Sequence, residues 1–263
     1  MDKITSKSNE KIKLAAALSS SSRERRRRGL FFVEGVRLCR DAAQSGITIK
    51  DAFFTEEAFA KHSETVSIIA EKAEYVCLID ARLCAKLSDV KSPQGVFCVC
   101  KMLDKTKSCN KIDEKGKYIS LDNVQSPDNL GAISRSAEAF GLSGLIISSG
   151  CDIYNPKAQR AAMGSLLRLP VFETSSLPRL LSEASLKGML TAAAVPDASA
   201  QSVFALSTDG GVICVTGNEG AGVSQEVADA CDISVTIPMR GGAESLNAAA
   251  AAAVLMWEMT RNG

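Results

Sequence analysis

Residues 118–140 read YISLDNVQSPDNLGAISRSAEAF and contain, in order, a short apolar strand, a polar loop and a helix. The same alternation continues to the end of the chain. Short, continuous apolar strands separated by helices are typical of a parallel sheet that is covered on both faces. The sequence therefore predicts an α/β domain in this half of the chain. The predicted strands are 118–123, 145–149, 190–195, 212–216 and 233–237, and the predicted helices are 129–140, 156–165, 178–187, 224–230 and 245–260.

The first hundred residues have a similar but less regular pattern. Short apolar runs at 31–33, 75–79 and 96–99 alternate with helix-like stretches, which predicts a second, smaller α/β domain. Between the two halves, the polar and lysine-rich stretch 101–117 has the composition of a linker. We therefore expect a substrate-binding domain at 1–103, a linker at 104–116 and a second domain at 117–263.

Composition excludes several classes of protein. The 263 residues are 46% hydrophobic and 23% charged, which is ordinary for a folded chain and excludes disorder. The net charge is only +1, but the first thirty residues hold nine basic and three acidic groups. This uneven distribution predicts a polyanionic partner for the N-terminal part.

The sequence predicts no metal site, no disulfide bonds and no membrane-spanning helix. The nine cysteines are scattered without a C-x-x-C pair, and the single histidine, His62, lies in a polar stretch. The start of the chain lacks the apolar core of a signal peptide. The longest apolar run, 248–257, is far shorter than the roughly 18 residues that a membrane-spanning helix needs. We expect a reduced, cytoplasmic protein with no metal and no membrane partner.

Polar loops follow three of the predicted strands. In the first, 121–131, Pro127 favours an extended residue before it, and Asp128 or Asn129 can cap the following helix. Arg135 lies less than two turns beyond Asn129. By itself this pattern is also that of an ordinary capped helix with a surface arginine.

The other two loops are rich in glycine. Residues 215–222 have the spacing G-x-x-G-x-G, which is neither the dinucleotide fingerprint nor a P-loop. Their glycines allow a ligand to approach the backbone closely, although a tight turn would also need them. In the third loop, 237–247, Ser245 is a natural helix cap, and Asn247 has a side chain available for another task.

Taken together, the three loops resemble the three motifs of the SpoU/TrmH family of the SPOUT superfamily, RNA ribose 2'-O-methyltransferases that use S-adenosylmethionine. The matching stretches are DNVQSPDNLGAISRSAEAFG (122–141), TGNEGAGV (216–223) and IPMRGGAESLNAAAA (237–251). The stretch 154–165 resembles the family's connecting helix, and 31–35 and 92–96 resemble its N-terminal substrate-binding domain. The order and spacing of the motifs make the resemblance specific.

The resemblance implies a trefoil-knotted methyltransferase domain with a parallel sheet, and a homodimer with the RNA site at the junction of the subunits. It implies that Gly217, Ile237 and Leu246 contact the cofactor. The implied catalytic set is Arg135, Asn129, Glu219, Ser245 and Asn247. One departure is Ser126, where many members of the family have aspartate before the proline.

The implied reaction places particular demands on Arg135. A guanidinium hardly ever loses its proton in proteins, so we expect Arg135 to hold a phosphate and to stabilise charge on the attacking oxygen. The run Arg25, Arg26, Arg27 and Arg28 is the strongest basic cluster, and we expect it to contact RNA phosphates rather than to be only a solvated face.

Ribosomal RNA is the favoured substrate, because the N-terminal domain resembles those of ribosomal-RNA enzymes; transfer RNA is the alternative. An RNA-binding assembly factor that has lost catalysis is a second alternative. A nucleotide-dependent oxidoreductase is a third, but the chain lacks its glycine fingerprint.

Overall fold

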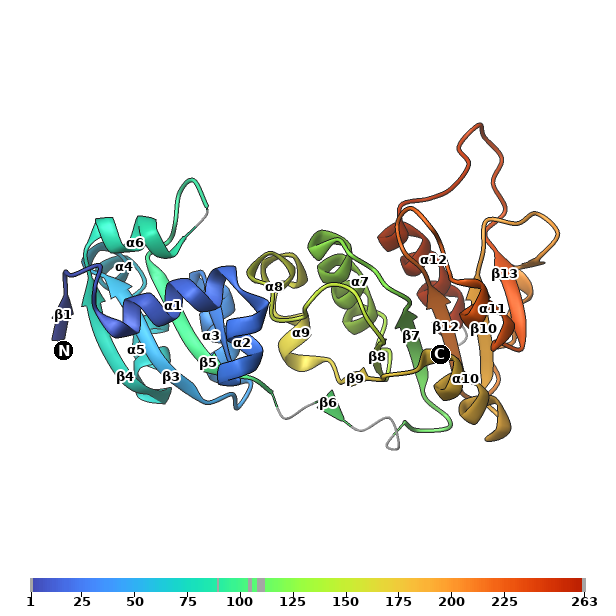
Figure 1. Cartoon of the computed structure of the whole chain (residues 1–263), viewed down its shortest axis with the longest axis horizontal. Helices are drawn as coiled ribbons and strands as arrows, with labels where there is room; N and C mark the ends of the chain where they lie inside the picture. The colour runs from blue at the N-terminus through green and yellow to red at the C-terminus, as the bar shows by residue number, and fades with distance from the viewer. Residues whose placement is uncertain (1, 89, 104–105, 108–111, 262–263) are drawn as a thin grey trace. The chain divides into compact units, whose positions relative to one another are not determined.

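The structure is a computed structural model that describes residues 2–88, 90–103, 106–107 and 112–261. The chain divides into two compact units. Unit 1 comprises 1–103 together with 152–167, and unit 2 comprises 104–151 and 168–263. Each unit has its own sheet (Figure 1). Part of the predicted linker, 104–105 and 108–111, lies outside the described residues, whereas Thr106–Lys107 form the short strand β6.

Unit 1 is built on a five-stranded mixed sheet in the order β1-β4-β3-β5-β2. Strands β1, β3 and β4 are parallel to one another, and β5 runs antiparallel to both β3 and β2. The strands are β1 (Asp2–Ile4), β2 (Leu30–Glu34), β3 (Ile49–Thr55), β4 (Ala73–Ile79) and β5 (Val96–Lys101). The helices are α1 (Glu10–Ser20), α2 (Ser22–Arg28), α3 (Val36–Gln44), α4 (Glu56–Lys61), α5 (Ser63–Lys72), α6 (Ala81–Leu87), α8 (Pro156–Ala162) and α9 (Ser165–Arg168), the last ending one residue beyond the unit.

One core of unit 1 forms where apolar side chains of α1 and α6 meet the sheet, and α3 and α5 bury further apolar side chains against its strands. Ile12 and Leu18 of α1 and Leu83 of α6 are fully buried against Phe32 and Phe97, whose rings stack with centroids 5.8 Å apart. This confirms the small α/β domain expected for the N-terminal part of the sequence.

Unit 2 contains an eight-stranded sheet in the order β11-β13-β10-β12-β7-β8-β9-β6, and every strand pair in it is parallel. This confirms the predicted parallel sheet. Its strands are β6, β7 (Lys117–Leu121), β8 (Gly144–Ile147), β9 (Val171–Glu173), β10 (Leu190–Ala194), β11 (Gln201–Ser202), β12 (Val212–Thr216) and β13 (Ile233–Thr236). Its helices are α7 (Pro127–Ala139), α10 (Leu177–Leu186), α11 (Gln225–Asp229), α12 (Ala248–Thr260) and the short 3-10 helix η2 (Val203–Ala205).

Helices cover the sheet of unit 2 in two layers. Helix α10 packs beside α11, and both bury apolar side chains in one core with Tyr118, Ile146 and Val215. Helices α7 and α12 pack against each other, α7 against β8, and α12 against β7 and β12. The interior is dry enough that burial raises the pKa of the Cys214 thiol to about 12, so this cysteine stays protonated.

Candidate functional site

Three loops meet where parallel strands of unit 2 end. The first, 122–126, joins β7 to α7. The second, 217–224, joins β12 to α11, and the third, 237–247, joins β13 to α12. Strands β7 and β12 are direct neighbours in the sheet, so their loops leave the same edge side by side. This is the edge at which parallel α/β sheets usually bind ligands.

The first loop begins α7 in a way that leaves a side-chain amide free. Ser126, not Asp128 or Asn129 as expected, is the N-cap, and its hydroxyl accepts a hydrogen bond from the Asn129 backbone N–H at 3.3 Å. Pro127 follows at the first helical position, where it costs no backbone hydrogen bond. The Asn129 side chain is therefore not used for capping, although it is buried.

The Glu219 carboxylate of the second loop holds the first loop in place. It accepts hydrogen bonds from the backbone N–H groups of Gln125 at 3.1 Å and Ser126 at 2.9 Å, and from the Asn129 side-chain amide at 2.9 Å. Partial burial by itself raises the pKa of the Glu219 carboxyl, but these hydrogen bonds outweigh that effect. Its pKa therefore lies below the ordinary 4.5, so Glu219 is an ionised acceptor and a poor base at neutral pH.

The third loop joins the same network through Asn247. Its side-chain nitrogen donates to the Asn129 side-chain oxygen at 3.1 Å, while its own side-chain oxygen accepts from the Ala249 backbone N–H at 2.9 Å. Asn247, not Ser245, is thus the N-cap of α12. An asparagine suits this position because its amide can cap a helix and donate a hydrogen bond at the same time. Side-chain hydrogen bonds from Asn129 to Glu219 and from Asn247 to Asn129 therefore connect all three motifs.

The glycine-rich loop closes on itself. Asn218 and Gly222 exchange backbone hydrogen bonds, each at 2.9 Å, and the Asn218 side-chain oxygen accepts from the Gly220 N–H at 2.9 Å. A Cβ on Gly217 would lie 2.0 Å from the backbone carbon of Gly222. Glycine at 217 is therefore required by this closure, whether or not a ligand approaches.

Polar residues outside the implied catalytic and cofactor-binding sets also fasten the loops. The Asp122 carboxylate accepts from the Ser224 backbone N–H at 2.8 Å, and the Asn218 amide donates to the Asn123 backbone carbonyl at 3.0 Å. Asn123 itself adopts a left-handed conformation with φ 57°, which asparagine tolerates better than most residues. Asp122, Asn123 and Asn218 lie within two residues of the end of a buried strand, and that position is the signal by which the sequence could identify them.

The structure does not bring every predicted site residue into this network. Arg135 is exposed on α7, roughly 9 Å further along the helix axis than Asn129, and its side chain makes no ion pair or hydrogen bond with the described residues. Ser245 is exposed and likewise without a side-chain partner in the described parts of the chain. Gly217 is buried, Ile237 is half-buried, and Leu246 is 38% exposed.

The third loop has features that suit an amphiphilic ligand. Within the described chain, no hydrogen bond between backbone groups engages residues 239–246. Two large apolar side chains in the same loop, Met239 and Leu246, are 41% and 38% exposed. A ligand with a flat apolar ring system and several polar edge groups could satisfy both sets of groups.

The basic run at 25–28 is divided between the interior and the surface of unit 1. Arg25, expected to contact RNA, is buried instead: its guanidinium pairs with Asp152 at 2.8 Å and donates to the Leu18 carbonyl at 2.7 Å. This arginine is not available to a phosphate. Arg27 and Arg28 are exposed and pair with Glu24, and Arg26 is exposed.

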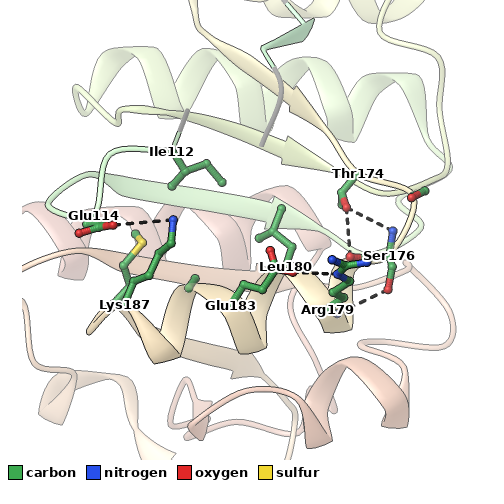
Figure 2. A pocket seen from close by; sticks show the side chains of 11 residues that line it. Ile112, Glu114, Thr174, Ser176, Arg179, Leu180, Glu183 and Lys187 are labelled. Carbon is green, nitrogen blue, oxygen red and sulfur yellow. Dashed lines mark hydrogen bonds and ion pairs between the residues drawn. The ribbon is translucent and has the colours of Figure 1, made fainter. Parts of the chain in front are cut away.

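A separate pocket of about 220 Å³ lies along α10, and none of the predicted site residues lines it (Figure 2). Its two cations are paired with carboxylates, Arg179 with Glu183 at 2.7 Å and Lys187 with Glu114 at 3.7 Å. The pocket therefore offers no free positive charge. Among the described residues there is no group of histidine, cysteine or acidic side chains that could hold a metal, and no helix that could cross a membrane.

Comparisons with known proteins agree with this geometry. Residues 116–257 match the SpoU rRNA methylase family, and residues 9–98 match the MRM3-like substrate-binding domain. Over 98% of its length the chain is 29% identical to a 23S rRNA (guanosine(2553)-2'-O)-methyltransferase, RlmP of Bacillus subtilis, of which the match covers 99%. It is 28% identical to a 23S rRNA (uridine(2479)-2'-O)-methyltransferase of Streptomyces viridochromogenes, over 98% of this chain and 92% of that protein.

Solved structures give the same result for the fold. An AdoMet-bound rRNA methyltransferase from Sinorhizobium meliloti superposes with a TM-score of 0.86 and 26% identity, over 99% of this chain and 97% of that one. The SpoU methyltransferase AviRb from Streptomyces viridochromogenes, in complex with AdoMet, superposes with a TM-score of 0.82 and 29% identity, over 96% and 97%. The match to the family spans more than half of the chain and includes all three loops of the site. The chain therefore belongs to the SpoU rRNA methylase family.

Proposed function

We propose that this protein is a methyltransferase that uses S-adenosylmethionine to modify the ribose 2'-hydroxyl of a nucleotide in ribosomal RNA. The observation that carries this proposal is the hydrogen-bonded chain from Glu219 through Asn129 to Asn247, because it joins the three motifs of the family at one edge of the sheet. A binding protein that had lost catalysis would have no need to keep this arrangement.

The third loop fits the proposed cofactor. Leu246 and Met239 offer apolar surface for an adenine ring, and the unpaired backbone groups of 239–246 offer hydrogen bonds to its polar edges. We assign Gly217, Ile237 and Leu246 to cofactor binding, as the family resemblance implies. When bound, S-adenosylmethionine supplies an electrophilic methyl group on a positively charged sulfur.

The protein's own residues would position the ribose hydroxyl and stabilise its oxygen during attack. Glu219, with its lowered pKa, fixes the orientation of Asn129 rather than accepting a proton. Asn129, Asn247 and Ser245 provide polar side chains near the reacting groups. Arg135 would hold the neighbouring phosphate and stabilise negative charge on the 2'-oxygen, and the proton would leave to a phosphate oxygen or to water.

Ribosomal RNA is favoured over transfer RNA because two relatives that match this chain along nearly its whole length are named as 23S rRNA enzymes. These relatives, at 29% and 28% identity, are named for a guanosine and a uridine respectively. The target base therefore differs among enzymes that are equally similar to this one, and mapping of ribose methylation must identify it.

A homodimer and a trefoil knot belong to the same proposal. Trp257 of α12 is 57% exposed and packs edge-on against Phe140 at a centroid distance of 5.9 Å, so unit 2 presents an exposed aromatic side chain that a second copy could cover. Arg135 lies on α7, which packs against α12, and we propose that it completes the site of the other subunit. We assign substrate binding to 1–103, the linker to 104–116 and catalysis to 117–263, in a cytoplasmic enzyme.

Transfer of labelled methyl groups from S-adenosylmethionine to a 23S rRNA transcript tests this function. The Arg135→Ala variant should keep its fold and cofactor affinity and lose roughly a hundred- to a thousand-fold in single-turnover rate at saturating RNA. Arg135→Lys should recover part of the rate if charge is what matters, and almost none if the planar fork is needed. The control is Arg179→Ala, an exposed arginine on α10. Full activity of Arg135→Ala would remove this residue from the active site.

A further inference from the structure

Three helices of unit 1 concentrate positive charge around one strand. Helices α2, α3 and α8 all pack against β2, which is an edge strand of its sheet. Together they carry nine arginines and lysines and only two acidic residues. The nine cations are Arg23, Arg25, Arg26, Arg27, Arg28, Arg37, Arg40, Lys157 and Arg160, and the two acids are Glu24 and Asp41.

Four of these cations are held by carboxylates and five are not. Arg25 and Arg160 are tied to Asp152 and Glu34, and Arg27 and Arg28 share Glu24. The other five are exposed and have no ion pair or side-chain hydrogen bond with any described residue. On α2 and on α3 the two free arginines are three residues apart, so each of these helices directs its free charge to one side. The five, called the β2 basic surface below, are Arg23, Arg26, Arg37, Arg40 and Lys157.

This concentration accounts for the charge of the whole unit. Unit 1 has a net charge of +6 and unit 2 of −5, whereas α2, α3 and α8 together have +7. The remainder of unit 1 is therefore close to neutral. A field of this kind, confined to one region of a molecule, attracts a polyanion to that region.

A groove of unit 1 that reaches Arg28 of α2 does not offer the same chemistry. It has a volume of about 710 Å³ and lies between α1, the end of α2 and the first residues of β2, β3 and β4. Its lysines are neutralised, Lys13 by Glu10 at 2.8 Å, Lys50 by Glu74 at 3.4 Å, and Lys11 by Asp51. Phosphates would have to displace these carboxylates, so the free cations around β2 are the better polyanion site.

We propose that the β2 basic surface binds the phosphate backbone of the substrate RNA, and that α8 is part of it. This inference rests on the proposed function. It adds that Lys157, although it lies in the stretch that matches the methylase family, acts with the substrate-binding domain. Contacts of this kind position the RNA and raise its affinity without reading its sequence.

The test measures binding of the full-length protein to a 23S rRNA transcript over a series of salt concentrations. Each lost phosphate contact should reduce the slope of log K against log salt by about 0.7 to 0.9. We expect the double variant Arg37→Ala, Arg40→Ala to lose about two such contacts, and Lys157→Ala about one. The matched control is Lys61→Ala, Lys72→Ala, which removes two exposed cations from α4 and α5, helices that pack on β3.

The outcomes separate this inference from the proposed function. Methyl transfer at saturating RNA should be unchanged in the α3 and α8 variants, while the RNA concentration needed for half-maximal rate rises. An unchanged slope in the α3 double variant, or an equal loss in the control, would overturn the β2 basic surface. An unchanged slope in Lys157→Ala alone would overturn the part assigned to α8. If the wild type methylated no RNA, the proposed function would fail, and the salt dependence would still decide this surface.

Discussion

Two adjacent arginines, Arg25 and Arg26, have different environments in this protein. Arg25 and Arg26 lie side by side in the run that most clearly indicates RNA binding, yet Arg25 is 3% exposed and pairs with Asp152, whereas Arg26 is exposed. Composition cannot separate them, because charge alone does not show which side of a helix meets a core. Asp152 is 127 residues away along the chain, so no local pattern identifies it as the partner.

These two arginines allow a paired test. Arg25→Ala should lower the free energy of unfolding by about 3 to 5 kcal/mol, because it removes a buried guanidinium that pairs with Asp152 and donates to the Leu18 carbonyl. Arg26→Ala should change it by less than about 0.5 kcal/mol, as is usual for exposed positions. Denaturant unfolding measures both. Equal, small effects would show that the Asp152 pair does not stabilise unit 1.

Glu219 offers a second test at the scale of one side chain. Glu219→Gln replaces one carboxylate oxygen by an N–H donor, which then faces the donors of Gln125, Ser126 or Asn129. Because the site is partly open to water, we expect a loss on the order of tenfold in methyl transfer and only a small loss of global stability. Glu226→Gln, an exposed glutamate in the first turn of α11, is the control.

The stabilisation that the Glu219 carboxylate contributes to the folded protein depends on pH in a definite direction. Its pKa is lowered in the folded protein, so the ionised form is the one that folding favours. The stabilisation is fully present above the ordinary value of 4.5 and is lost as the pH falls through the lowered folded value. The small difference in thermal unfolding between the wild type and Glu219→Gln should therefore persist at neutral pH and disappear only in acid. A difference that vanished near neutral pH would contradict this assignment.

At the scale of helices and strands, the sequence predicts best where the pattern is long. All five strands predicted for the second half are present, and helix 129–140 corresponds to α7. The pattern does not indicate the three-residue strand β9, because so short a segment has no period to detect.

Helix starts are harder to predict than helices. Ser126 is the N-cap of α7, although Asp128 and Asn129 are also suitable cap residues. Asn247 is the N-cap of α12, although Ser245 is also suitable. Serine, aspartate and asparagine are all good caps, so residue type alone does not distinguish these candidates. What decides between them is the tertiary position of the neighbouring loop, which the local sequence does not contain.

Only part of the hydrogen-bond network of the candidate site can be predicted from the sequence, because the network also depends on the tertiary position of neighbouring loops. The motifs indicate Asn129, Glu219 and Asn247, and the structure joins them by hydrogen bonds. They do not indicate Asn218, because its contribution depends on the first loop lying beside the second.

The glycine-rich loop gives a test at this scale. Gly217→Ala should disrupt the Asn218–Gly222 closure, because its Cβ would lie 2.0 Å from the Gly222 backbone. We expect cofactor binding to fall by at least about tenfold, which corresponds to roughly 1.4 kcal/mol. Gly220→Ala is the matched control, since its Cβ would meet only the Asn218 side-chain oxygen, at an ordinary 3.7 Å. Calorimetry with S-adenosylmethionine measures both, and equal affinities would show that closure of the loop is not needed.

At the scale of the whole molecule, the compact units differ from the order of the sequence. The segment 152–167 lies between β8 and β9 along the chain, yet it belongs to unit 1. Tyr154 packs against Phe31 with ring centroids 4.8 Å apart, and Arg160 pairs with Glu34 at 3.3 Å. Helical periodicity shows that a segment has an apolar face, but it does not show which core will bury that face. The sequence therefore predicts a helix at 156–165 but not the residues against which that helix packs.

Residues 117–263 alone should not form a stable monomer. This fragment retains the segment 152–167 but lacks the N-terminal residues of the unit in which its apolar side chains are buried, among them Ile153, Tyr154 and Leu166. Exposing each large apolar side chain costs about 1.5 to 3 kcal/mol, so we expect the fragment to self-associate. Adding a separate fragment of residues 1–103 should return it to a defined complex, because the missing half of the core is restored.

Size-exclusion chromatography with light scattering distinguishes the self-associated fragment from the defined complex. The control is the same fragment with Leu186→Ser, which changes an apolar side chain that is already 88% exposed and should not alter the self-association. A fragment that stayed monomeric and had no affinity for 1–103 would mean that the segment 152–167 is stable without the rest of unit 1. The boundary between the two units would then follow the order of the sequence after all, and Lys157 would lose its place beside the cations of α2 and α3.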